Sequence, residues 1–496
     1  MNRNSHSEGV INLEFNEVMQ VLSGQLHKGA IQTSKTVLEK YSYDRTSQMS
    51  LPEAVIKAHS ETEVQSILRS ANENAIPVVT RGAGSSLTGA VVPIVRGIVL
   101  DVSDMDKFTV VKKDSVVIAE PGVMTSTLQA AVEAEGLFYP PDPASLEFST
   151  IGGNLATNAG GARGVKYGVT RDYVRGLTVV LADGQILNFG GQYHKNSTGY
   201  QLMHLIIGSE GTLGVITNSV LRLIPLPPYT NTLRAMFRSV ETTSEAVTGI
   251  FEKGFNPNTI ELMDRVSLEI VSTDLDFNLS EEHNAMIIIE CDGTDQTQVD
   301  QDLGTIATLM QQKGASEVVI ANTEKERHTI WNARRSVSDA LAKSAPNKLV
   351  EDIVVPRSKI PALVQEVRGI AEANGLTIAL FGHAGDGNLH PNFLFDLKNP
   401  NEIQRVEKAS KEIFELGINM GGTLSGEHGI GTLKRQFLED AVGTNVLDLM
   451  RSVKKLFDPN NILNPQKIFP VENDKQDKEG FLSDLPFNSE YNDVVE

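Results

Sequence analysis

The sequence predicts an α+β protein with an N-terminal α/β part and a C-terminal part in which helices cover an antiparallel sheet. Helix and strand patterns alternate along the first part, and prolines at positions 225, 227 and 228 then interrupt the chain. Beyond them, apolar strands alternate with amphipathic helices. A chain of 496 residues is too long for one core. We predict a lead at 1–50, a first domain at 51–228, a second domain at 229–470 and an acidic tail at 471–496.

The composition excludes several classes of protein. A net charge of −19 argues against a nucleic-acid partner, because phosphate binding needs clustered Lys and Arg. The single cysteine, Cys291, excludes an internal disulfide and a cysteine-ligated iron–sulfur cluster or zinc site, and is typical of the reducing cytoplasm. The chain starts without an apolar signal region and has no apolar run of membrane-spanning length. We therefore predict a cytoplasmic protein whose contact with a membrane, if any, is peripheral at its inner face.

Local signals indicate the elements of the first domain. The stretch 60–74 predicts a helix, because Ser60 and Glu63 have capping-box spacing and four apolar residues share one face: Val64, Ile67, Leu68 and Ala71. Apolar runs at 75–79, 97–103 and 115–122 predict strands. The stretch 124–136 predicts a helix closed by Gly136.

Glycines mark the next two segments. Residues 152–168 contain six glycines and predict a loop, because glycine weakens helix and strand interiors. The stretch 177–190 predicts a hairpin with Asp183 and Gly184 as its two-residue turn.

The second domain shows a different pattern. Runs at 285–291 and 315–321 predict strands, and 296–313 and 328–344 predict helices. From Val471 onward, eight acidic residues against two lysines predict a largely disordered tail.

The segment "RGAGSSLTG", residues 81–89, follows a predicted strand. It fails the G-x-G-x-x-G pattern of nicotinamide sites, because Leu87 stands in place of the third glycine. Its glycines still let backbone N–H groups approach a pyrophosphate, with the hydroxyls of Ser85, Ser86 and Thr88 as donors. A surface turn is an equal alternative for this segment alone. The second glycine-rich region, about 65 residues on, favours a large ligand, because two irregular loops in one domain need contacts to order them.

Four stretches together carry a resemblance: "VVTRGAGSSLTG", "YPPDPAS", "TIGGNLATNAGGARGVKYG" and "GSEGTLGVIT". They are similar to the FAD-binding domain of the vanillyl-alcohol-oxidase flavoprotein superfamily. From Tyr41 to Pro470 the chain resembles the FAD-linked 2-hydroxyacid dehydrogenases and oxidases, which include glycolate oxidase flavin subunits, D-lactate dehydrogenases and D-2-hydroxyglutarate dehydrogenases.

The resemblance implies a two-part FAD-binding domain and an antiparallel cap domain, with a C-terminal return to the cofactor. FAD is expected to bind non-covalently, because the first loop has no histidine and Cys291 lies outside the loops. The residues implied to contact FAD are Arg81, Gly82, Ala83, Gly84, Ser85, Ser86, Gly89, Pro141, Asp142, Gly152, Gly153, Asn154, Gly161, Glu210, Ile216 and Asn464.

Two histidines stand close together in "GHAGDGNLH", residues 382–390. If Asp386 and Gly387 form a two-residue hairpin turn, His383 and His390 face each other with Cβ atoms about 5 Å apart. A hairpin whose histidines only form hydrogen bonds remains an alternative. The run "GGTLSGEHGIG" favours a metal site, because its Glu427 and its histidine stand among five glycines without an evident structural use.

The resemblance assigns roles to these residues and three others. It implies that His383, His390 and Glu427 hold a divalent metal, zinc first, with manganese or iron as alternatives. It implies that His428 is the general base, although a place behind the ligands or a fourth ligand position stays open. Three more residues are expected at the substrate: Arg334, which would grip its carboxylate, Ser338 and Asn392.

The implied reaction oxidises a 2-hydroxyacid to the 2-oxoacid. The metal lowers the hydroxyl pKa, His428 takes the hydroxyl proton and the C2 hydride passes to the flavin. Val350 stands where D-2-hydroxyglutarate enzymes carry a lysine, which favours D-lactate or glycolate, although Lys348 is two residues away.

The chain has no nicotinamide loop and no cysteine set that would pass electrons onward. An external acceptor is expected: oxygen, a quinone, an electron-transfer flavoprotein or an iron–sulfur subunit. A homodimer, or a flavin subunit that works only within a membrane-attached complex, stays open.

Overall fold

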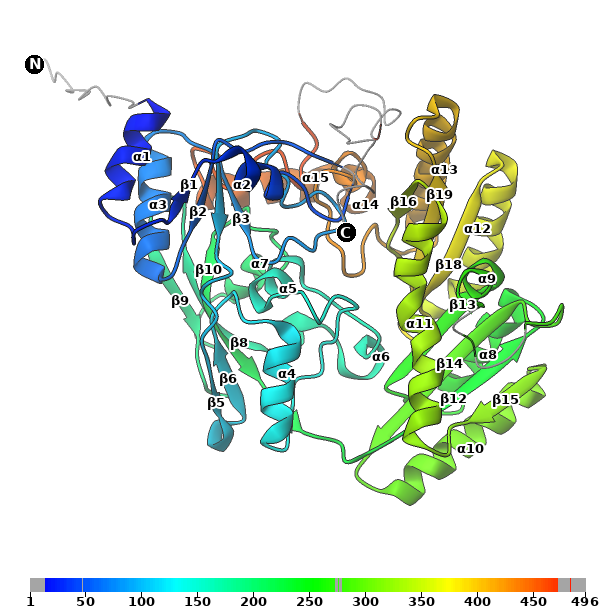
Figure 1. The fold of residues 1–496 in the computed structure, drawn as a ribbon. Helices are drawn as coiled ribbons and strands as arrows, with labels where there is room; N and C mark the ends of the chain where they lie inside the picture. Colours follow the sequence, from blue (N-terminus) through cyan, green and yellow to red (C-terminus); the bar gives the residue numbers. More distant parts are fainter. Residues whose placement is uncertain (1–13, 47, 273–274, 276–278, 472–481, 483–496) are drawn as a thin grey trace, which may run out of the picture.

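The computed structural model describes residues 14–46, 48–272, 275, 279–471 and 482. Two main bodies lie side by side in Figure 1. The N-terminal body contains two larger β-sheets, and the C-terminal body has one large sheet with helices on both faces. The predicted α+β class is confirmed.

The first sheet has the strand order β1-β2-β4-β3, in which β1 is antiparallel to β2 and the other pairs are parallel. Its strands and nearby helices are α1 (Phe15–Ser23), β1 (Ile31–Gln32), α2 (Lys35–Lys40), β2 (Ala54–Lys57), α3 (Glu61–Glu73), β3 (Val78–Arg81) and β4 (Ile98–Asp101). Helices α1 and α3 share one apolar core with β2 and β4. The described residues of the predicted N-terminal lead, 14–46 and 48–50, therefore belong to this body.

The second sheet is antiparallel, with the order β5-β6-β10-β8-β9. Its strands are β5 (Phe108–Val111), β6 (Val116–Ala119), β8 (Val174–Val180), β9 (Ile186–Gly190) and β10 (Val215–Arg222). The helices in this region are α4 (Thr125–Ala134), α5 (Ile151–Thr157), α6 (Gly164–Tyr167) and α7 (Met203–Ile206), and β7 (Leu137–Phe138) pairs with β11 (Ile224–Pro225).

The C-terminal body has the strand order β15-β12-β14-β13-β18-β19-β16, with β17 also paired to β19. The strands are β12 (Tyr229–Phe237), β13 (Thr259–Asp264), β14 (Ala285–Gly293), β15 (Glu317–Ile320), β16 (Asn347–Val350), β17 (Ile353–Val354), β18 (Thr377–His383) and β19 (Asn388–Phe395). One face is covered by α8 (Val240–Glu252), α10 (Gln296–Gln312), α12 (Ile360–Asn374) and α13 (Pro400–Asn419). The other face carries α9 (Arg265–Ile270) and α11 (Glu324–Ser344).

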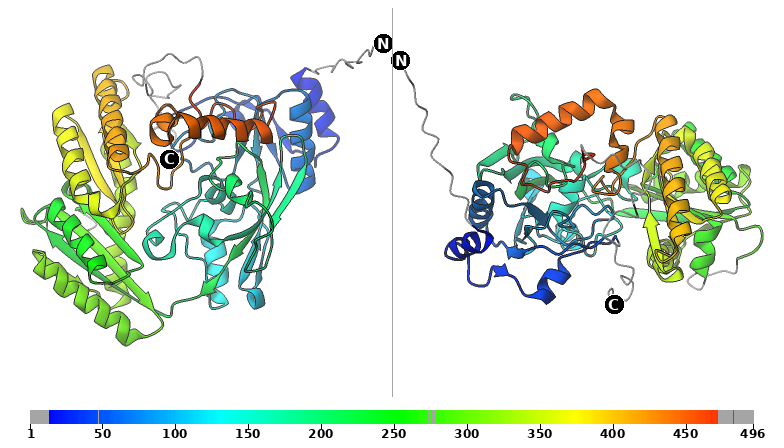
Figure 2. Two further views of the ribbon diagram at one scale, coloured as in Figure 1. Left: turned by 180° about the vertical axis from the view of Figure 1, so that it is seen from behind. Right: turned by 90° about the horizontal axis from the view of Figure 1, so that it is seen from above.

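The chain then returns to the first body through α14 (Leu438–Val442) and α15 (Thr444–Phe457). Figure 2 shows α15 lying across that body in the view from behind. The Lys454 ammonium donates to the Thr212 carbonyl (2.8 Å), and Asn464 N–H donates to the Val78 carbonyl (2.8 Å). Helix α15 and the segment after it therefore contact the N-terminal body at residues far earlier in the sequence.

Several sequence predictions agree with the structure. Ser60 caps α3 by accepting from the Glu63 N–H, and all four residues of its predicted apolar face are fully buried. Gly136 follows α4 with φ +74°. Strands β4, β6, β14 and β15 and helices α10 and α11 fall on the stretches that predicted them.

Two local predictions are wrong. Residues 152–168 are not all loop, because α5 and α6 form there. Thr150 caps α5 by accepting from Gly153 N–H (3.3 Å), and a Cβ on Gly152 would lie 2.5 Å from the Pro121 side chain. The absence of a side chain at Gly152 therefore allows the short helix α5 to pack closely against Pro121. The hairpin turn also differs, because Val180 pairs with Ile186 and the backbone N–H of residue 181 donates to the carbonyl of Gln185, leaving a three-residue loop.

Within the described part of the chain, no helix has the length and apolarity to cross a bilayer. The predicted disordered tail lies outside the described residues, apart from Val471 and Leu482. Leu482 is buried, and its N–H donates to the Glu407 carboxylate (2.8 Å).

Candidate active site

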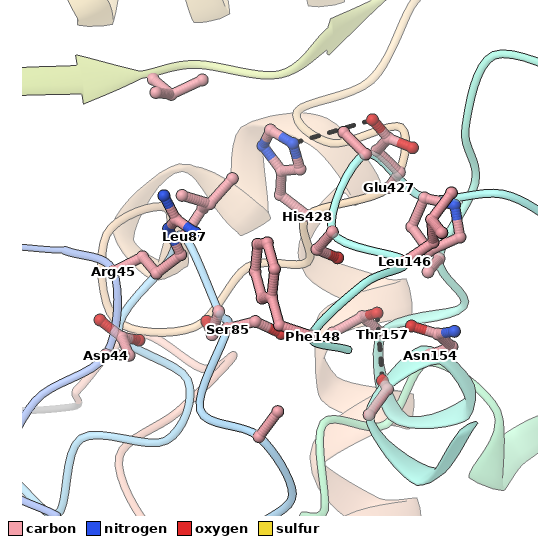
Figure 3. A pocket seen from close by; sticks show the side chains of 18 of the residues that line it. Asp44, Arg45, Ser85, Leu87, Leu146, Phe148, Asn154, Thr157, Glu427 and His428 are labelled. Carbon is pink, nitrogen blue, oxygen red and sulfur yellow. Dashed lines mark hydrogen bonds and ion pairs between the residues drawn. The ribbon is translucent and has the colours of Figure 1, made fainter. Parts of the chain in front are cut away.

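A cavity of about 1650 Å³ lies between the two bodies. It exceeds the roughly 300–1,000 Å³ of a typical small-ligand pocket, so it has room for a large cofactor beside a small substrate. In Figure 3, Glu427 and His428 lie across the cavity from Ser85 and Asn154. The predicted site residues that line it are Arg81, Gly82, Ala83, Gly84, Ser85, Ser86, Asp142, Gly152, Gly153, Asn154, Glu210, Ile216, Arg334, Ser338, His383, His390, Glu427 and His428.

The segment 82–87 forms one wall of the cavity. Within the described residues, its backbone N–H groups donate to no protein acceptor. Gly84 has φ +75°, a conformation that side chains disfavour, and a Cβ there would come within 2.1 Å of the Arg81 guanidinium. A run of unpaired N–H groups on a glycine turn can bind an anionic group.

The predicted ligands meet on the opposite wall. His383 Nε2 lies 3.2 Å, and His390 Nε2 3.4 Å, from Oε1 of Glu427. One ligand atom from each of the three residues lies within 4.8 Å of the others. The two imidazole rings meet at 87°, with centroids 5.2 Å apart. Two imidazole nitrogens and a carboxylate oxygen are a donor set suited to zinc and similar divalent ions.

The register predicted for the two histidines is wrong. His383 pairs with Asn388, and His390 pairs with Phe381, so the histidines are diagonal neighbours. The loop is longer because the Gly385 N–H donates to the Ile260 carbonyl of β13 (3.2 Å), which draws the turn toward a third strand. The rings still converge, because long side chains reach across a diagonal pair.

Glu261 on β13 joins the histidines to the predicted substrate arginine. Its Oε1 lies 2.5 Å from His383 Nδ1, and its Oε2 accepts from Arg334 Nε (2.6 Å). Burial opposes ionisation, but Arg334 and His383 lower the pKa of Glu261 to about 2. Burial alone would lower the pKa of His383, yet the carboxylates of Glu261 and Glu427 raise it well above its usual value.

His428 stands next to these groups, with Nε2 3.8 Å from Oε1 of Glu427, as the dashed line in Figure 3 marks. Burial lowers the pKa of His428 to about 4, although the Asp352 carboxylate acts in the opposite direction. The imidazole is therefore neutral near pH 7 and able to accept a proton.

Lys348 also lines the cavity, as does Val350. The Lys348 ammonium donates to the carbonyl (2.9 Å) and hydroxyl (3.0 Å) of Ser338. Burial lowers the pKa of Lys348 to about 8. A predicted substrate residue, Ser338, is thus held by a lysine.

Comparisons with known proteins agree with this geometry. Residues 52–190 match a family model described as an FAD binding domain, and residues 226–468 match one described as the C-terminal domain of FAD linked oxidases. The glycolate oxidase subunit GlcD of Bacillus subtilis is 42% identical over 431 residues, covering 86% of this chain and 92% of that protein. The chain belongs to the FAD-linked 2-hydroxyacid dehydrogenases and oxidases.

Two further comparisons support the family and the fold. The D-lactate dehydrogenase of Archaeoglobus fulgidus is 37% identical over 440 residues, covering 87% of this chain and 95% of its own length. The crystal structure of p-cresol methylhydroxylase with substrate bound superposes with a TM-score of 0.76 at 17% identity, over 93% of this chain and 98% of that one. This family fold confirms the predicted architecture of a vanillyl-alcohol-oxidase type FAD-binding domain with an antiparallel cap domain.

Family membership makes FAD the cofactor, and the cavity suits it. The N–H groups of residues 82–87 have no protein acceptor in the described part of the chain and match the need of a pyrophosphate for donors. Glu210 closes another side, where its carboxylate accepts from the N–H groups of Ile430 (2.7 Å) and Gly431 (2.8 Å). That contact ties the first body to the loop that carries Glu427.

Four residues predicted to contact FAD do not line the cavity: Gly89, Pro141, Gly161 and Asn464. These four residues instead make close contacts or hydrogen bonds that hold the loops around the cavity in place. A Cβ on Gly161 would meet the Asp142 carbonyl oxygen at 2.2 Å, and the Pro141 carbonyl accepts from Gln129 (2.8 Å). Asn464 donates to the carbonyls of Ala90 (2.9 Å) and Glu210 (2.7 Å), and the Gly89 carbonyl accepts from Lys467 (2.7 Å).

Asn392 does not line the cavity either, contrary to the prediction. It is fully buried in β19 between β16 and β18, and its amide donates to the His390 carbonyl (2.7 Å).

Sequence reasoning missed Glu261 and Asp352. Glu261 lies inside an apolar strand, "TIELMD", far from every motif. Asp352 is one of two adjacent acids in "VEDIVVP", and both its side chain and that of Glu351 are buried. The pair of adjacent acids before an apolar strand could have indicated Asp352 as a site residue, because carboxylates are rarely buried without a partner.

Proposed function

We propose that this chain oxidises a small D-2-hydroxyacid, D-lactate or glycolate, to the 2-oxoacid with the help of a divalent metal ion. The observation that carries the proposal is the juxtaposition of the neutral His428 with the His383–His390–Glu427 cluster on a cavity wall that also presents Arg334. The relatives named glycolate oxidase subunit and D-lactate dehydrogenase support the substrate class.

The site residues have different roles in the proposed reaction, and each role follows from the charge of the side chain. When bound, FAD would supply the acceptor for the C2 hydride, and a divalent ion would lower the pKa of the substrate hydroxyl. His383, His390 and Glu427 would hold the ion, while Arg334 pairs with the substrate carboxylate. His428 takes the hydroxyl proton at Nε2.

Electrons must leave to an external acceptor, for which we propose a quinone, an electron-transfer flavoprotein or an iron–sulfur subunit. The proposal also includes oxygen as an oxidant. The protein would work in the cytoplasm, free or at the inner face of the membrane. The word "subunit" in the names of relatives supports a second candidate, a flavin chain that acts only within a multi-subunit complex. Turnover by the isolated chain with a dye acceptor separates the two, because an obligatory subunit would be silent.

The decisive experiment is anaerobic bleaching of the flavin absorbance by a panel of D- and L-2-hydroxyacids, with and without a chelator. D-lactate or glycolate should bleach the flavin, and chelation should slow the bleaching at least tenfold. A flavin that no hydroxyacid bleaches would contradict the proposed function.

The metal has its own test. His390→Ala and Glu427→Gln should each lower bound metal, measured by elemental analysis, while the FAD content stays unchanged. Equal loss of FAD and metal would mean that these residues only maintain the fold.

The position of Lys348 on the cavity wall favours one alternative substrate, a hydroxyacid with a second carboxylate such as D-2-hydroxyglutarate. Including it in the panel with the Lys348→Met variant tests this. A selective loss of bleaching by the dicarboxylate would support the alternative.

A further inference from the structure

Asp352 lies between β16 and β17 and has no exposed surface. Its carboxylate accepts hydrogen bonds from one short segment and one neighbouring amide. Oδ2 accepts from the Ser425 hydroxyl (2.6 Å) and from the N–H groups of Gly426 (3.0 Å), Glu427 (3.0 Å) and His428 (2.9 Å), and Oδ1 accepts from the Asn388 amide (2.6 Å). One side chain therefore fixes the backbone of three consecutive residues, two of which belong to the candidate site.

The same carboxylate faces two imidazoles. Its Oδ1 lies 3.7 Å from Nδ1 of His390, and its Oδ2 lies 3.9 Å from Nδ1 of His428. Both Nδ1 atoms are buried and have no hydrogen-bond partner among the described residues. The two rings stack at 14°, with centroids 5.0 Å apart. The Glu427 carboxylate faces the Nε2 atoms of the same rings at 3.4 and 3.8 Å, so a cation bound there would leave the hydrogen of each ring on Nδ1, toward Asp352.

We infer that Asp352 is a positioning residue for the proposed oxidation. It holds the 425–428 segment so that Glu427 reaches His383 and His390, and it sets the tautomer of both His390 and His428. This inference rests on the proposed function for its catalytic consequence. Its consequence for metal binding does not depend on turnover.

A competing interpretation makes Asp352 itself a metal ligand, because Asp352, His390 and His428 also present ligand atoms within 4.8 Å of one another. The hydrogen bonds argue against it. Oδ2 already accepts four donors, and an ion on Oδ2 would lie against the three N–H groups, whose positive ends repel a cation. The position of Asp352 fits an anchor behind the ligands.

The test is Asp352→Asn in the full-length FAD-loaded chain. Its control is Asp264→Asn, because Asp264 is also buried and accepts from a backbone N–H (2.9 Å) and a hydroxyl (2.7 Å), both of Ser267, outside the cavity. Zinc and cobalt affinities are measured by titration, together with FAD content, kcat and KM. Positioning predicts a 10–100-fold loss of metal affinity. It also predicts a comparable fall in kcat, with KM within about twofold because Arg334 is untouched.

Further outcomes decide between the interpretations. Metal affinity and kcat within twofold of the parent would overturn the inference, and so would two ions per chain in the parent and one in the variant. If Asp352→Asn does not fold, Ser425→Ala and Asn388→Ala each remove one partner of Asp352 and should weaken metal binding in smaller steps. No change in either would also overturn it. If the parent binds metal but oxidises no hydroxyacid, the proposed function fails while the metal result stands.

Discussion

The Glu261 carboxylate is shared by the Arg334 guanidinium and the His383 imidazole, which it contacts at 2.6 and 2.5 Å from its two oxygens. One buried charge thus links the group proposed to bind the substrate carboxylate to a proposed metal ligand. A histidine that binds a metal through one ring nitrogen usually donates a hydrogen bond from the N–H of the other ring nitrogen to a partner such as this carboxylate.

Glu261→Gln should therefore affect two functions at once. Glutamine keeps the size of the side chain but removes the charge that orients both partners. We expect metal affinity to fall by roughly 10–100-fold and KM for the hydroxyacid to rise. Metal titration and steady-state kinetics measure these effects. Glu317→Gln is the control, because Glu317 pairs with Arg234 (2.7 Å) outside the cavity. If only stability changed, the shared role would be refuted.

Arg334→Lys should raise KM more than it lowers kcat. A hydrogen bond to a charged group contributes about 1.5–3 kcal/mol, which corresponds to roughly a 10–150-fold loss of kcat/KM. The control is Arg234→Lys, because Arg234 is also buried and its guanidinium pairs with Glu317 (2.7 Å) outside the cavity. Because both substitutions keep the positive charge, similar losses of kcat/KM at both positions would contradict a specific role of the Arg334 guanidinium.

His428→Asn should lower kcat by at least roughly 100-fold while FAD and metal content stay unchanged, because a general base contributes about 10²–10⁴ in rate. Absorbance spectra, elemental analysis and stopped-flow flavin reduction measure the three quantities. Loss of metal from this variant would instead make His428 a fourth ligand.

Gly84→Ala should lower the FAD content. The added Cβ would require a left-handed backbone at φ +75° and would displace the Arg81 guanidinium from the cavity wall. Gly304→Ala in α10 has open space around its Cβ and should leave the FAD content unchanged. The ratio of flavin to protein absorbance after purification compares them, and equal ratios would argue against a phosphate-binding role for this loop.

Stability should fall as the pH rises from 4.5 to about 7 because of Glu351. Burial raises the pKa of this carboxyl from its ordinary 4.5 to about 7, although Lys434 lowers it. A raised pKa means that the folded state favours the neutral form. The stabilisation is then complete below pH 4.5 and is lost as the pH passes through 7. Glu351→Gln should flatten the decrease of melting temperature between pH 4.5 and about 7, and an unchanged slope would exclude Glu351 as its source.

Local pattern predicted much of the fold. The apolar face of α3 and the glycine after α4 depend on neighbours in sequence, so periodicity and end signals were sufficient. The turn between β18 and β19 could not be predicted in this way. Its length depends on a hydrogen bond from Gly385 to Ile260, 125 residues earlier in the chain, which no local pattern includes.

The sequence by itself determined the family, the cofactor and the residue types of the site, because glycine-rich loops and a Glu-His pair among glycines are local in the chain. Only the tertiary structure decided which carboxylates support the histidines. Glu261 lies 122 residues from His383, and Asp352 lies 76 residues from His428. The reason is physical, since a buried carboxylate stays ionised only where folding brings cations and N–H donors to it, and those partners come from separate strands and loops.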